Sequence, residues 1–253
     1  MFYPREPMSL RAEVDTLLDL AQPRASATSC KAIVAPHAGY VYSGPVAASV
    51  FAGLADREEI KRVVLLGPAH RVAFQGISVP GVDAFATPLG VVKIDTVGAA
   101  SLVAAGHAQE LPAAHVGEHC LEVELPFLQR LFGEDVLVLP MLVGDAPPQS
   151  VANALASVWG GDETLVVVSS DMSHYHPYEE AVVIDRETCA QVLSGSASLS
   201  HEQACGATPW NALQIVASQK GLKPTLVDMR NSGDTAGDKS RVVGYGSFAY
   251  VPA

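Results

Sequence analysis

The chain has 253 residues, of which 49% are hydrophobic and 17% are charged, and its formal net charge is −11. A chain of this composition can bury a large core, which excludes an intrinsically disordered protein. Because the 16 lysines and arginines are scattered and the net charge is negative, the surface would repel a phosphate backbone, and we expect no nucleic-acid partner.

Apolar, β-branched segments alternate along the chain with segments of helical periodicity. In chain order we predict a strand at 31–35, a helix at 45–54, a strand at 62–66, an extended segment at 75–92, helices at 96–104 and 121–131, a strand at 136–143, a helix at 148–158, a strand at 164–169, helices at 178–193 and 209–220, and strands at 224–228 and 241–251. The extended segment is broken by Pro80, Gly81 and Pro88, which favours a hairpin or an excursion at a sheet edge.

Helix starts carry their own signals. Three predicted helices open on a proline, whose missing N–H costs nothing in the first turn: Pro45, Pro148 and Pro209. Asp95 precedes the helix at 96–104 and suits its N-cap.

The alternation of strands and helices predicts one α/β domain of three layers, α/β/α, around a largely buried sheet. The last predicted strand is long and no helix follows it, so we expect an antiparallel partner and a mixed sheet. Since no linker, repeat or low-complexity tract divides the chain, we assign residues 1–253 to a single domain, in which residues 1–30 are the least distinctive part.

The lack of a recognisable targeting signal in the sequence favours a cytoplasmic protein. Prolines and charged residues interrupt the first 20 residues where a signal peptide needs an apolar stretch. No apolar run approaches the roughly 18–20 residues of a membrane span, so we expect no membrane partner. The four cysteines are far apart and form no CxxC pair, which favours reduced thiols.

Histidines and a carboxylate follow three of the predicted strands directly. The strand at 31–35 leads to His37, the strand at 62–66 leads to His70, and the strand at 164–169 leads to Asp171 and His174. Open α/β sheets bind ligands along the carboxyl ends of their parallel strands. If these strands are parallel, the four side chains meet at one rim and form a shared pocket.

A metal ion is the natural occupant of such a pocket. Neutral imidazole is a common ligand for zinc, iron, copper and nickel, and two histidines with one carboxylate suit non-haem iron or catalytic zinc. Such a site needs further carboxylates to orient the imidazoles, and Asp171, Glu118 and Glu122 are available.

Later segments supply more candidates. Glu118 and His119 come from a loop that enters a predicted helix, and the loop 231–238 is rich in glycine and small polar residues. Capping and an ordinary solvated turn are equally good explanations of these two segments. Outside the metal-ligand and acid/base candidates, we expect four residues to line the pocket: Glu118, Tyr40, Cys205 and Ser232. To four other histidines we assign no function: His107, His115, His176 and His201.

Six sequence blocks together resemble the Memo family, whose bacterial and archaeal members are also called AmmeMemoRadiSam system protein B. The blocks are PHAGYVYSG at 36–44, GPAH at 67–70, GEHCLEVELPFLQ at 117–129, SSDMSH at 169–174, CG at 205–206 and NSGD…VVGYGSFAY at 231–250. The resemblance covers residues 30–251. It implies a fold similar to the catalytic subunit of class III extradiol dioxygenases, which bind non-haem Fe(II) through two histidines and a carboxylate.

The resemblance also implies roles for individual residues. His37 and His70 would be the two metal-binding histidines, with Asp171, His174 and His119 around them. Animal members carry a cysteine in the late loop, whereas this chain has none after Cys205. Counting back from the last strand, the matching position is Asp234, or Thr235 if the gap is placed differently.

The resulting hypothesis is an oxidoreductase of dioxygenase type that acts on an unknown small substrate. Fe(II) would be bound by His37, His70 and Asp234, since a carboxylate favours a hard metal, with zinc and copper as alternatives. His174 or His119 would be the general acid and base, oriented by Asp171. Two other functions stay open. One is zinc-assisted hydrolysis, and the other is a non-catalytic module that binds a small molecule or a peptide end among partner proteins of a shared pathway.

Overall fold

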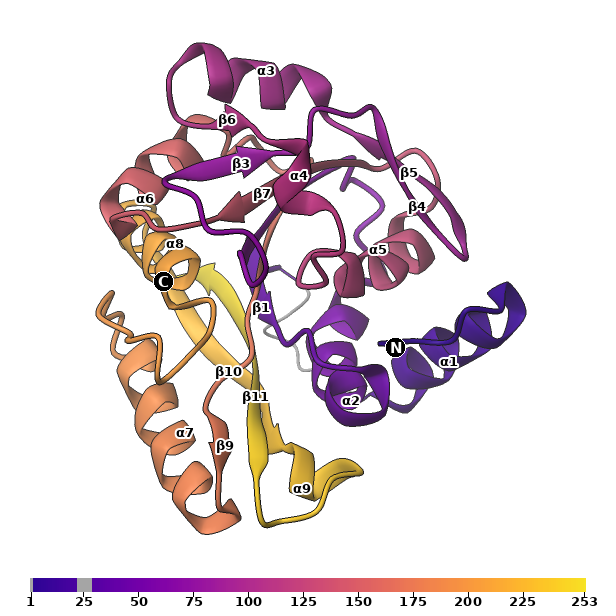
Figure 1. The fold of residues 1–253 in the computed structure, drawn as a ribbon, viewed down its shortest axis with the longest axis vertical. Coiled ribbons are helices and arrows are strands. Elements are labelled where there is room, and N and C mark those ends of the chain that lie inside the picture. The colour runs from indigo at the N-terminus through magenta and orange to yellow at the C-terminus, as the bar shows by residue number, and fades with distance from the viewer. Residues whose placement is uncertain (1, 22–28) are drawn as a thin grey trace.

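A computed structural model describes residues 2–21 and 29–253 and shows a mixed sheet with helices on both faces (Figure 1). Its helices and strands are, in chain order, α1 (Pro7–Leu20), β1 (Ala32–Ala35), α2 (Tyr40–Phe51), η2 (Ala52–Leu54), β2 (Arg62–Pro68), β3 (Ile77–Val79), β4 (Ala84–Thr87), β5 (Gly90–Ile94), α3 (Thr96–Ala104), β6 (Gln109–Glu110), α4 (Pro112–His115), η3 (Glu122–Glu124), α5 (Leu125–Phe132), β7 (Leu137–Val143), α6 (Pro148–Ser157), β8 (Thr164–Ser169), β9 (His174–His176), α7 (Tyr178–Leu193), α8 (Ala207–Gln219), β10 (Leu222–Asn231), α9 (Ser232–Thr235) and β11 (Val242–Pro252).

The main path of the sheet runs β10-β11-β1-β8-β2-β7-β3-β6. Its centre is parallel: β1 pairs with β8, β8 with β2, and β2 with β7. The long C-terminal strand β11 pairs antiparallel with both β1 and β10, so the predicted mixed sheet is confirmed. The segment at 75–92 does form an edge excursion, in which β4 and β5 make an antiparallel hairpin.

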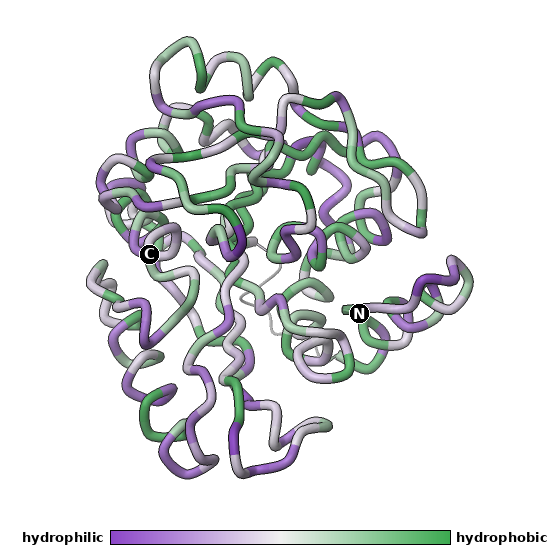
Figure 2. Tube along the Cα trace, viewed as in Figure 1, coloured by the Kyte–Doolittle hydropathy of each residue, from purple (hydrophilic) through white to green (hydrophobic). Residues whose placement is uncertain are grey.

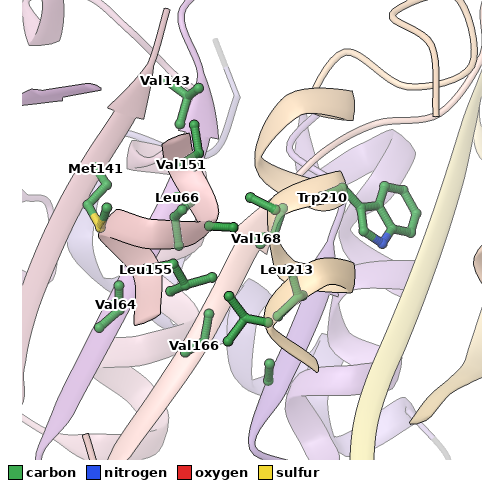
Figure 3. Packing of buried hydrophobic residues seen from close by; sticks show 14 of the residues in the cluster. Val64, Leu66, Met141, Val143, Val151, Leu155, Val166, Val168, Trp210 and Leu213 are labelled. Atoms are coloured by element: carbon green, nitrogen blue, oxygen red, sulfur yellow. The ribbon is translucent and has the colours of Figure 1, made fainter. Parts of the chain in front are cut away.

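Because successive side chains of each central strand point to opposite faces, the sheet has two hydrophobic cores, one on each face. On one face, residues such as Val64 and Val166 pack with α3, α6, α7 and α8; Figure 3 shows part of this packing. On the other face, residues such as Val63 and Val167 pack with α1, α2 and α5. Hydrophobic residues are accordingly concentrated on the interior strands (Figure 2). The α/β/α architecture is therefore confirmed.

Helix starts agree with the sequence in most places. Asp95 caps α3 by accepting a 2.9 Å hydrogen bond from Gly98 N, and Pro148 opens α6 as predicted. Pro209 lies in the first turn of α8, two residues after its start. The prediction for Pro45 is wrong, because α2 begins at Tyr40 and Pro45 lies inside it. One proline removes a single helical hydrogen bond, and the nine buried residues of α2 hold the helix in spite of it.

The N-terminal helix α1 has no counterpart among the predicted elements, because only Leu10 and Val14 of its 14 residues are fully buried. Its N-terminus is capped by Glu6, whose carboxylate accepts hydrogen bonds from Met8 N and Ser9 N. Among the described residues, no helix is both long and apolar enough to cross a membrane.

Candidate metal centre

A cavity of about 800 Å³ lies at the carboxyl ends of the central parallel strands. The parallel pairing of β1 with β8 and of β8 with β2 explains why residues far apart in sequence meet there. Its lining is mostly polar, and it includes the sequence candidates His37, His70, His119, Asp171, His174 and Cys205. The structure thus brings together all four residues that follow the predicted strands.

Three imidazoles form a triangle in this cavity. The ring centroids of His37 and His70 are 5.3 Å apart, those of His37 and His119 are 5.4 Å apart, and those of His70 and His119 are 4.7 Å apart. One nitrogen from each ring lies within 4.8 Å of the other two. His37 is buried and His119 half-buried, whereas His70 stands at the exposed mouth. This arrangement gives three nitrogen ligands around one point.

The Nδ1 atoms of the first two rings are used by the protein. His37 Nδ1 lies 2.8 Å from Ser169 Oγ, and His70 Nδ1 lies 3.0 Å from Glu118 Oε1. An imidazole whose Nδ1 is bound to an outer partner presents Nε2 as its free nitrogen. His37 and His70 therefore offer Nε2 to a ligand.

Glu118 contacts two of the three histidines of the triangle. Its carboxylate accepts hydrogen bonds from His70 N at 2.7 Å, His119 N at 2.8 Å and Cys120 N at 3.2 Å, in addition to His70 Nδ1. Burial alone would raise the pKa of this carboxyl group, but the imidazoles of His119 and His70 and the backbone N–H groups outweigh burial and hold the pKa well below its usual range. Glu118 is therefore an anion that orients two imidazoles, as carboxylates behind metal-bound histidines do.

Burial keeps His37 neutral. It lowers the pKa of this imidazole to about 4; the nearby Asp171 opposes the shift, and His70 and His119 add to it. A neutral imidazole at physiological pH retains the lone pair that a metal requires.

The third ring fits a metal ligand for a different reason. In the described part of the chain, His119 Nδ1 is buried and has no hydrogen-bond partner; it lies 3.2 Å from Glu118 Oε1 without the alignment of a hydrogen bond. The ring stacks on Phe2, with centroids 4.4 Å apart and planes 9° apart. Since Nδ1 faces Glu118, Nε2 is the atom that His119 would offer to a cation, and a cation bound there would favour an Nδ1–H able to donate to Glu118.

The remaining cavity residues surround the triangle. Asp171 Oδ1 accepts a 2.8 Å hydrogen bond from His37 N, so it fixes the His37 loop rather than orienting His174. His174 instead bonds Met172 O through Nδ1 at 2.8 Å, which leaves its Nε2 free. Cys205 Sγ lies 3.4 Å from His37 Nε2, and burial, with the Asp171 charge, raises the pKa of this thiol to about 12.

The late loop lies elsewhere. Asp234 accepts hydrogen bonds from Tyr178 OH at 2.6 Å and from Asn231 N at 3.0 Å, which closes the capping box of α9. Figure 1 shows α9 at the end of the hairpin formed by β10 and β11. In the described part of the chain, neither Asp234 nor Thr235 lines the cavity or completes a ligand group with His37 and His70. The ring that does so is His119.

Two predicted pocket residues have structural contacts. Tyr40 is buried, and its hydroxyl donates a 2.7 Å hydrogen bond to Val123 O. Ser232 Oγ accepts a 3.1 Å hydrogen bond from Val243 N. Neither belongs to the residues that line the cavity. Glu118 lies behind the triangle, as described above, and Cys205 lines the cavity as expected.

Other residues of the site had not been singled out from the sequence. His176 and His201 line the outer cavity, although we assigned them no function. Phe2 comes from the least distinctive segment, and nothing in its local sequence signals a contact with His119. Ser169 lies within a sequence block that resembles the Memo family. Nothing in that block indicated the contact between Ser169 and His37.

The fold and the site define an α/β/α protein with a trihistidine pocket at the carboxyl edge of a mixed sheet. Comparison with known proteins places it more narrowly, since a sequence model of the family described as Memo-like protein matches residues 1–249. The chain belongs to this family.

Curated relatives agree with that assignment. The chain is 36% identical to a "MEMO1 family protein" of Aquifex aeolicus, with 96% of this chain and 94% of the relative covered. It is 33% identical to a "MEMO1 family protein" of Sulfolobus acidocaldarius, with 98% of this chain and 96% of the relative covered. A third relative, "MEMO1 family protein MK0963" of Methanopyrus kandleri, is 32% identical to this chain, with 98% of this chain and 95% of the relative covered. The similarity therefore extends over nearly the full length of each protein.

Proposed function

We propose that this protein is a metal-dependent oxidoreductase whose ion is bound by His37, His70 and His119. The observation that carries the proposal is the triangle of imidazoles, with one nitrogen of each ring within 4.8 Å of the others at the wall of a large cavity. Three protein ligands with an open position are typical of catalytic rather than structural metal sites. His119 takes the place that the sequence had suggested for Asp234.

Imidazole donors suit iron, copper and zinc. We favour Fe(II), on the strength of the fold that the Memo resemblance implies, and such an ion would supply redox and Lewis-acid chemistry to a small organic substrate. Residues of the chain would position the groups of the site and transfer protons.

His174 is the best-placed group for moving a proton. It lines the cavity, its Nδ1 is bound to Met172 O, and its Nε2 is therefore the atom that faces a ligand. Asp171 holds the backbone of His37 and adds negative charge beside the imidazoles. Positioning of this kind, with a general acid and base within reach, supports catalysis better than simple storage of an ion.

Zinc-assisted hydrolysis is the second candidate, and one observation favours it. Three histidines with an open fourth position are also the ligand set of a known class of catalytic zinc sites, in which bound water becomes acidic. The cavity residues alone accommodate either reaction, so the metal and the consumption of oxygen separate the two.

The first experiment is a calorimetric titration of metal-free protein with Fe(II), Zn(II) and Cu(I) under anaerobic conditions. His119→Ala should weaken binding more than about 100-fold, because even outer partners of metal ligands are worth about 10–100-fold. Asp234→Ala and the control His107→Ala, whose side chains do not line the cavity, should stay within about threefold. Loss of binding in Asp234→Ala with retention in His119→Ala would overturn the ligand assignment.

The second experiment separates the reactions. The iron-loaded protein is incubated with a panel of catechols, and the zinc-loaded protein with esters, amides and phosphates. Oxygen uptake that depends on His174 supports the oxidoreductase, and hydrolysis without oxygen uptake replaces it with the hydrolase. Binding of a small molecule or a peptide end, without turnover of any panel member, would contradict both and leave a binding module that works with partner proteins.

A further inference from the structure

Ser169 has more polar neighbours than its single proton can serve. Its Oγ lies 2.6 Å from Cys120 O, 2.8 Å from His37 Nδ1 and 2.9 Å from Glu124 Oε1. All three distances are hydrogen-bond lengths, and Ser169 is fully buried, so water cannot supply a missing partner. A hydroxyl group donates one hydrogen bond and accepts two.

The positions of the protons follow from this count. A carbonyl oxygen can only accept, so the proton of Ser169 goes to Cys120 O. The two lone pairs of Ser169 must then each receive a hydrogen, one from His37 Nδ1 and one from Glu124. Glu124 can donate only if its carboxyl group is protonated.

The surroundings of Glu124 favour the same state. Its side chain is fully buried, and its second oxygen, Oε2, has no hydrogen-bond partner among residues 2–21 and 29–253. Within the described ranges, no lysine, arginine or histidine forms a salt bridge with it. Burial raises the pKa of Glu124 well above its usual value; the contact with Ser169 opposes this, and the Asp171 charge adds to it. An unpaired oxygen costs less on a neutral acid than on a buried anion.

The opposite assignment leaves a defect. If Glu124 were ionised, it would draw the proton of Ser169 toward itself. Cys120 O would then face Ser169 Oγ at 2.6 Å with no hydrogen between the two oxygens. A buried acceptor without its donor carries the full cost of its lost hydration, and the buried charge of the carboxylate would add a further cost.

We propose that Glu124 is a neutral carboxylic acid that donates its proton to Ser169. Because the proton of Ser169 is committed to Cys120 O, Ser169 accepts from both Glu124 and His37. The His37 proton is then held on Nδ1, and Nε2, which lies 3.4 Å from Cys205 Sγ at the cavity wall, keeps its lone pair. The use of that lone pair for metal binding rests on the proposed function, whereas the protonation of Glu124 does not.

The direct test is infrared difference spectroscopy of the metal-free protein. Wild type minus Glu124→Gln at about pH 8 should show the carbonyl band of a protonated carboxylic acid, shifted downward in D₂O. This pH lies above the pKa of Asp185, about 6, so the other buried carboxyl group with a raised pKa among the described residues is ionised and does not contribute. Absence of the band overturns the proposal, whatever the protein does with metals.

Two variants test the donor role. The amide introduced by Glu124→Gln would donate an N–H to Ser169 as the neutral acid does, so this variant should keep the His37 proton on Nδ1 in ¹⁵N NMR spectra and cost little stability. Glu124→Leu removes the donor and leaves one lone pair of Ser169 unsatisfied, so it should lower the free energy of unfolding more than Glu124→Gln does. If Glu124→Gln destabilises the protein as much as Glu124→Leu, Glu124 does not donate to Ser169.

Discussion

Glu118→Gln is the substitution whose effect the structure defines most closely. The carboxylate accepts four N–H groups, three of them on Oε1 and one on Oε2. An amide placed either way round points its NH₂ group at one of these donors. The variant therefore loses at least one charge-assisted hydrogen bond, worth about 1.5–3 kcal/mol, and leaves a buried N–H unsatisfied at about 1–3 kcal/mol.

We expect Glu118→Gln to lower the free energy of unfolding of the metal-free protein by about 3–5 kcal/mol. Urea denaturation measures this as a shift of the midpoint at constant slope. Glu122→Gln is the matched control, because Glu122 lies in the same block but is exposed and, within the described ranges, accepts only from Tyr3 OH at 2.6 Å; its cost should stay within about 1 kcal/mol. A loss below about 1 kcal/mol for Glu118→Gln would show that the carboxylate does not organise the imidazoles.

Two further predictions concern the surroundings of the site. Phe2→Ala removes the ring stacked on His119 and should weaken metal binding about tenfold by calorimetry, whereas Tyr3→Phe, which keeps the packing, should leave affinity nearly unchanged. Equal affinities for Phe2→Ala and wild type would show that the N-terminal segment does not hold the ligand. The second prediction is a pH dependence: burial raises the pKa of Asp185 from 3.8 to about 6, so its ionisation opposes folding above that pH. This penalty is absent below about pH 4 and reaches about 3 kcal/mol above pH 6, so Asp185→Asn should gain stability on wild type by that amount as pH rises from about 4 to about 8. A stability difference that stays constant with pH would contradict it.

Local sequence predicted the rim of the sheet well. A strand that runs directly into a histidine or an aspartate places that side chain at the carboxyl edge, and the parallel pairing of β1, β8 and β2 then brings His37, His70 and Asp171 together. This reasoning needs only periodicity and the rule that parallel strands end on the same side. The same features that predict the fold therefore predict two of the three imidazoles of the site.

The rest depended on contacts that no local pattern carries. Asp234 has the right chemistry for a metal ligand, but its two oxygens are used by Tyr178 and Asn231, and the capping box holds it in α9. Phe2 reaches His119 only because α1 packs against α2 and α5. Glu124 resembles an ordinary polar residue of an amphipathic helix, and its burial beside Ser169 appears only when η3 meets β8.

X-ray absorption spectroscopy of the iron-loaded protein counts the nitrogen and oxygen ligands of the ion itself. With a trihistidine site we expect three imidazole ligands in the wild type, two in His119→Ala, and an unchanged spectrum in Asp234→Ala. Two imidazoles in the wild type, with a shell altered by Asp234→Ala and not by His119→Ala, would contradict it.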